Sequence, residues 1–91
     1  MEECYKYINT ELFQIVWLHK EYAELLSKTT GHCWLIQGIN NTKTIVLYHK
    51  YHSSHNYHYQ GDFRDFTTVL SYIEKHDVKH KIRKEINETT S

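Results

Sequence analysis

Histidine and tyrosine are the residue types through which this chain could do chemistry, and each occurs eight times among its 91 residues. Three of the histidines, His32, His49 and His58, lie in or beside three predicted strands. A tight turn at residues 40–41 would pair His32 with His49, and a turn at residues 53–54 would pair His49 with His58. The sequence therefore predicts a row of three imidazoles across one end of a sheet.

Such a row has two chemical interpretations. Three converging imidazoles form an open zinc site with three protein ligands, here His32, His49 and His58. Alternatively, His49 and His58, with Tyr59 beside them, could act as acid and base toward RNA. However, residues 31–61 contain no acidic side chain that could orient an imidazole. We therefore expect these histidines to be structural, with no metal, no cofactor and no catalytic residue.

A second histidine pair lies near the C-terminus. His76 and His80, with Asp77 between them, are spaced so that both histidines could share one face of a helix. A metal site there would need another ligand, so we expect a solvated helix end.

The N-terminal third of the chain carries a helical pattern of apolar residues. Thr10 is a suitable N-cap for a helix over about residues 10–28, and Gly31 is a suitable C-cap. The apolar positions recur at spacings of three and four: Leu12, Ile15, Val16, Tyr22, Ala23 and Leu26.

Three predicted strands and a second helix follow. The strands cover about residues 33–39, 44–50 and 56–60, which are rich in β-branched and aromatic residues. Asp62 and Asp65 provide capping groups at the start of the second helix. Its apolar stripe is Phe63, Phe66, Val69, Leu70 and Ile73. Residues 79–91 form either a basic helical extension or a frayed tail.

The predicted fold class is α+β, a two-layer sandwich in which two helices cover one face of a three-stranded antiparallel meander. The whole chain, residues 1–91, is one domain. The order helix, three strands, helix resembles double-stranded-RNA-binding domains and small toxin ribonucleases of that type. That family holds phosphate with lysines at the start of its last helix, where this chain has Asp62, Arg64 and Asp65.

The alternation of side chains assigns the two sheet faces. On one face we expect a core formed by the sheet residues Trp34, Ile36, Ile45 and Leu47. The predicted helices cover this core with Ile15, Val16, Phe66 and Leu70. The other face is too apolar and aromatic for a surface without a use. The predicted partner-binding residues are on that face and the hairpin next to it: Leu35, Val46, Tyr48, Tyr59, Lys50, Tyr51, His52 and His55.

Charge and cysteine content limit the function classes. Eleven basic and eleven acidic residues give a formal net charge of zero, whereas dedicated nucleic-acid binders carry a basic excess. No apolar run is long enough to cross a membrane, so we expect no membrane partner. Two cysteines without a CxxC motif indicate reduced thiols and a cytoplasmic protein.

These observations favour a small non-enzymatic binding protein that acts by occupying a macromolecular partner, with protein as the expected partner. Compact chains of this composition are common in phages and mobile elements, so an inhibitor of a host nuclease or defence complex, of the anti-CRISPR type, is one form we expect. An RNA-binding module or small ribonuclease that uses the His-rich sheet end is an alternative. A structural homodimer is a further alternative.

Overall fold

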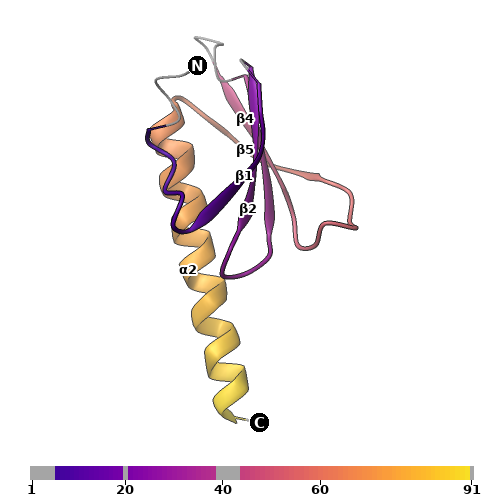
Figure 1. Ribbon diagram of the computed structural model, residues 1–91, viewed down its shortest axis with the longest axis vertical. Coiled ribbons are helices and arrows are strands. Elements are labelled where there is room, and N and C mark those ends of the chain that lie inside the picture. The colour runs from indigo at the N-terminus through magenta and orange to yellow at the C-terminus, as the bar shows by residue number, and fades with distance from the viewer. Residues whose placement is uncertain (1–5, 20, 39–43, 91) are drawn as a thin grey trace.

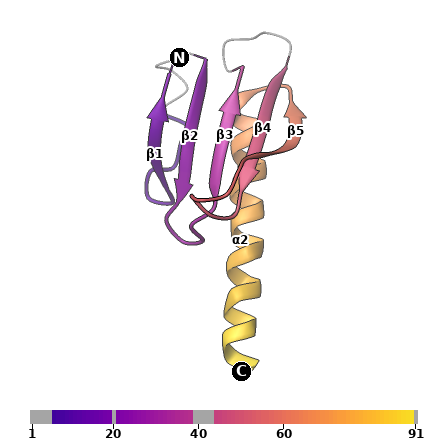
Figure 2. The ribbon, with the colours of Figure 1, turned by 90° about the vertical axis from the view of Figure 1, so that its right-hand side faces the viewer.

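The computed structural model describes residues 6–19, 21–38 and 44–90, and the side chains up to residue 81. Five strands are followed by one helix: β1 (Phe13–Leu18), β2 (Tyr22–Ser27), β3 (Cys33–Gln37), β4 (Ile45–Lys50), β5 (His58–Phe63) and α2 (Phe66–Thr90). Each strand pairs antiparallel with the next, so the sheet order equals the chain order. The helix packs on one face of this sheet (Figures 1 and 2).

The predicted class, α+β, is confirmed, but the predicted helix over residues 10–28 is wrong. Those residues contain the β1–β2 hairpin, and Gly31 lies in the β2–β3 connection with a φ of 78°. A bulge between Ile15 and Trp17 interrupts the two-residue alternation of β1. The predicted stripe therefore mixes both faces of the hairpin, because Ile15 and Ala23 face the helix, whereas Tyr22 and Leu26 lie on the opposite face.

The faces of β3 and β4 are as predicted, although their register differs. Ile36 pairs with Leu47 and Trp34 with His49, a shift of two residues from the predicted pairing. A shift of two leaves each side chain on its predicted face. The predicted turn at residues 40–41 lies outside the described residues. Between β4 and β5, the predicted pairing of His49 with His58 is confirmed.

The helix begins four residues later than the predicted cap at Asp62, because β5 continues to Phe63. Asp65 is the actual cap: its Oδ1 accepts a hydrogen bond of 2.8 Å from the Thr68 backbone N–H. From there α2 is continuous to Thr90. Figures 1 and 2 show that its C-terminal half extends past the end of the sheet.

The core lies between the sheet and α2. Trp34, Ile36 and Leu47 are fully buried, and Ile45 is 3% exposed, as predicted for these four side chains. The helix contributes Phe66, Val69, Leu70 and Ile73. Val16 was predicted to join this core but is 48% exposed, because the bulge turns it away. No helix within the described part of the chain has the length and apolar character needed to cross a membrane.

Candidate functional site

The sheet face opposite α2 carries one continuous row of side chains across all five strands. Direct pairing links Trp17 to Glu24, Glu24 to Leu35, Leu35 to Tyr48, and Tyr48 to Tyr59. Directly paired residues share a face, so these five residues form what we call the outer row. Trp17 and Tyr59, at its two ends, are 55% and 59% exposed. The outer row therefore presents large aromatic groups to solvent at both edges of the sheet.

The connection between β4 and β5 reaches across this face and is fastened to a residue of the outer row. The Tyr57 hydroxyl donates a hydrogen bond of 2.6 Å to Glu24 on β2, and Lys50 Nζ lies 4.3 Å from the centre of the Tyr57 ring. Burial, followed by the bond to Glu24, raises the pKa of Tyr57. Figure 1 shows this connection on the side of the sheet away from the helix. Tyr57 thus lies against the outer row at Glu24, and the rest of the row remains beside this anchored loop.

The predicted partner-binding residues divide between the two faces. Leu35, Val46, Tyr48 and Lys50 are half-buried on the outer face, with exposed Tyr59. His52 and His55 are exposed in the loop, with ring centres 5.6 Å apart. Tyr51 instead lies against histidines on the helix side, 4.7 Å from the His49 ring and 5.0 Å from the His32 ring.

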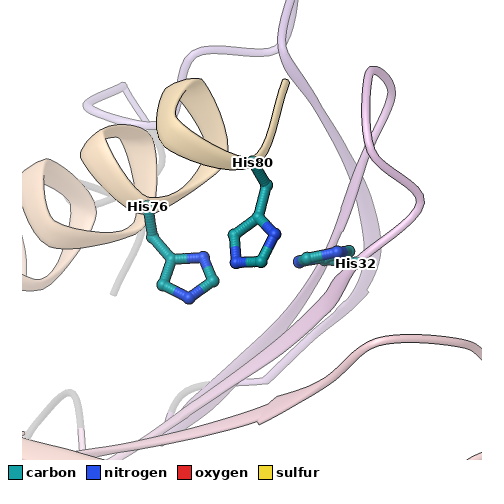
Figure 3. Close-up of side chains that lie close together, drawn as sticks. All are labelled: His32, His76 and His80. Carbon is teal, nitrogen blue, oxygen red and sulfur yellow. The ribbon is translucent and has the colours of Figure 1, made fainter. Parts of the chain in front are cut away.

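The helix side holds a cluster of histidines where α2 passes the end of the sheet. His76 and His80 lie one turn apart on α2 with stacked rings, their centres 4.5 Å apart. His32, just before β3, has its ring centre 4.7 Å from that of His80. The ligand nitrogens of His32, His76 and His80 all lie within 4.8 Å of one another. Figure 3 shows the helix histidines facing His32 across the gap between helix and sheet.

Two further histidines, His49 and His58, lie next to these three. His49 is fully buried, and its Nε2 lies 3.1 Å from Nδ1 of His32. The His58 ring is 5.3 Å from the His49 ring. Burial, with the neighbouring histidines, lowers the pKa of His49 to about 3, and burial with His80 and His32 lowers that of His76 to about 4. Both imidazoles are therefore neutral at pH 7 and available as nitrogen donors.

A buried carboxylate fixes the turn that carries His32. Asp77 on α2 is 5% exposed and accepts three hydroxyl hydrogen bonds, from Ser27 at 2.8 Å, Thr29 at 2.8 Å and Thr30 at 2.7 Å. Thr30 Oγ1 in turn accepts a bond of 3.2 Å from the His32 backbone N–H. Asp77 thereby holds the β2–β3 turn against the helix between the two helix histidines.

The structure brings together some of the predicted histidine sets and separates others. His32, His49 and His58 do lie in a row at the sheet end. The predicted pairing of His49 with His58 holds, but His32 lies before β3 and reaches His49 through its side chain, because His49 pairs with Trp34. However, the group of three that converges within the described residues combines His32 with the two helix histidines. Of the alternative catalytic set, His49 and His58 share the helix side, whereas Tyr59 is on the outer face with Tyr48.

Two residues of the candidate sites escaped the sequence interpretation. Trp17 was assigned to a helix. A prediction of a strand, based on its β-branched and aromatic neighbours, would have been needed to place it on the outer face. Asp77 was noted only as a residue between two histidines, since its hydroxyl donors lie about 50 residues earlier. Comparison of the chain with protein-family models, curated proteins and solved structures found no match.

Proposed function

We propose that this protein is a small non-enzymatic binding protein that holds a protein partner on the outer row. The observation that carries the proposal is the unbroken outer row, with Trp17 and Tyr59 more than half exposed at its ends. Tryptophan and tyrosine are the residues that most often anchor protein interfaces, since they bury much area with few rotamers to fix.

The charge of this face favours protein over nucleic acid as the partner. Strand pairing places Glu24, Lys50 and Asp62 on it, so acidic groups outnumber basic ones. A nucleic acid would have to approach these carboxylates with its phosphates, without the basic groups that release counterions. A protein surface meets no such barrier, and apolar groups between mixed charges are typical of an interface core with a polar rim.

Action by occupancy fits the chemistry of the outer row, because it needs no catalytic group. Inhibition of a nuclease or defence complex is one activity of this kind, and it is the specific form that we propose. We also propose the cytoplasm as the compartment, since Cys33 carries a free, buried thiol.

A photo-crosslinking amino acid placed at position 59 tests the proposal. Position 59 lies on the outer row, and position 7, where Tyr7 is 53% exposed, supplies a matched aromatic control outside the five strands. In lysate of the source cells, we expect one discrete protein adduct from position 59 and none from position 7. Excess unmodified protein should compete the adduct away, whereas excess Trp17→Ala protein should compete poorly.

Other outcomes would contradict the proposal. An adduct of twice the chain mass, formed by the purified protein alone, would identify the homodimer instead. An adduct that ribonuclease removes would identify RNA. Equal labelling from positions 7 and 59 would show that the outer row has no special role.

A further inference from the structure

We propose that His32, His76 and His80 form a binding site for a divalent transition metal, with zinc as its natural occupant. This site is on the helix side of the sheet and is independent of the outer row. Its donors come from two distant parts of the chain, the turn before β3 and two adjacent turns of α2. Their nitrogens already converge to within 4.8 Å of one another (Figure 3).

The distances fit a metal after a small adjustment. Zinc–nitrogen bonds of about 2.0–2.1 Å in a tetrahedron put ligand nitrogens about 3.3 Å apart, so the three donors must close by up to about 1.5 Å. His76 and His80 are half-buried on a helix, and rotation of their side chains supplies a movement of this size without moving the backbone.

The contacts around His32 select the nitrogen that binds. Its Nδ1 is engaged with Nε2 of His49 at 3.1 Å, which leaves Nε2 of His32 free for a metal. Metal-bound histidines usually have a partner for the other ring nitrogen, because it fixes the tautomer and the ring plane. The Asp77 hydrogen bonds hold the turn that carries this residue and place a negative charge beside the site.

One nitrogen of the proposed site has no hydrogen-bond partner among the described residues. It is the buried Nδ1 of His76, and Nδ1 of His49 and Nε1 of Trp34 nearby are buried and unpaired as well. A buried polar atom without a partner is costly, and a bound ion is one of the few things that remove this cost. The cluster therefore has a ligand-binding nitrogen that the protein alone leaves unused.

The donor set defines the class of metal. Imidazole nitrogens bind zinc, copper, nickel and iron, whereas magnesium and calcium prefer oxygen. Three imidazoles leave one tetrahedral position on zinc for water or an added ligand. The donors come from α2 and from the β2–β3 turn, so a bound metal would link the helix to the sheet. The link would lie where α2 begins to extend past the end of the sheet.

Zinc titration of the protein without a histidine tag, after chelator treatment, tests the site. We expect one zinc per chain by elemental analysis and a higher melting temperature with zinc, but no response to magnesium. His80→Gln and His76→Gln should each weaken zinc binding by more than about 100-fold. The double variant His52→Gln/His55→Gln removes two exposed loop histidines and should bind as the wild type does.

Three results would overturn the site. The first is substoichiometric zinc in the wild type, and the second is wild-type affinity in both helix-histidine variants. The third is loss of binding in the loop double variant. Far-UV circular dichroism of each metal-free variant separates lost ligands from lost fold, and if one glutamine variant unfolds, the other decides.

Discussion

The carboxylate of Asp77 accepts a hydrogen bond of 2.8 Å from the hydroxyl of Ser27, a residue 50 positions earlier in the chain. Both side chains are at least 95% buried. This bond, with those from Thr29 and Thr30, ties α2 to the end of β2. The same carboxylate thus supports the fold and positions the turn that carries His32.

Replacement of Asp77 by Ala should lower the free energy of unfolding by about 2–4 kcal/mol. The change removes three hydrogen bonds to a charged acceptor and leaves the hydroxyls of Ser27, Thr29 and Thr30 without that acceptor. Urea unfolding of the metal-free protein measures the loss. Val78→Ala is the control, since Val78 is next in sequence but 55% exposed, and should change stability by less than about 0.5 kcal/mol. Equal midpoints for both variants would contradict the role of Asp77.

Two neighbouring leucines distinguish the observed hairpin from the helix that the sequence predicted. Leu25 is fully buried against the core, whereas Leu26 is half-buried on the outer face. Leu25→Ala should therefore cost about 2–5 kcal/mol of unfolding free energy, and Leu26→Ala only about 1 kcal/mol. Chemical denaturation of both variants gives the comparison. The helical stripe included Leu26 and not Leu25, so a larger loss for Leu26→Ala would support the helix.

The sequence predicted the second half of the fold better than the first. Alternation in β3 and β4 was strong enough to assign Trp34 and Leu47 to the core, although the register was off by two. In β1 the bulge after Ile15 broke the alternation, and the remaining spacings matched a helix. The position of a bulge depends on the paired strand as well as on local preference. A prediction from the residues of one segment alone therefore misses it.

Stability should fall when the pH drops below about 6.5 in the metal-free protein. Burial lowers the pKa of His32, that of His49 to about 3 and that of His76 to about 4, against 6.5 when unfolded. Between about pH 6.5 and 4 the unfolded chain binds protons that the folded chain excludes, so acid favours unfolding. Urea midpoints measured in chelator at pH 8, 7, 6 and 5 should be level at first and then decline.

The carboxylate of Asp65 contributes at lower pH than the histidines. Hydrogen bonds from Thr68 and Thr67 lower the pKa of Asp65 from 3.8, so the stability that it adds is present above that value and is lost as the pH falls below it, outside the measured pH 5–8 range. The loop variant His52→Gln/His55→Gln should show the same decline as the wild type. Midpoints that stay constant or rise from pH 7 to pH 5 would show that the buried histidines are not held neutral by the fold.

Part of the candidate sites could be predicted from the sequence. Pairing of His49 with His58 followed from a turn at residues 53–54. The convergence of His32 with His80 did not, because it depends on how α2 crosses the sheet, and no local pattern encodes that. Likewise, Trp17 belongs to the outer row because of the β1–β2 hairpin, which the sequence pattern had predicted as a helix.

The most direct test of the central claim is the affinity of the crosslinked partner for variants at the two ends of the outer row. Trp17→Ala and Tyr59→Ala should each weaken the complex by about 1–3 kcal/mol while the melting temperature barely changes, since both side chains are more than half exposed. Tyr7→Ala, at 53% exposure, should bind as the wild type does. Titration calorimetry that gives wild-type affinity for both outer-row variants would contradict the account.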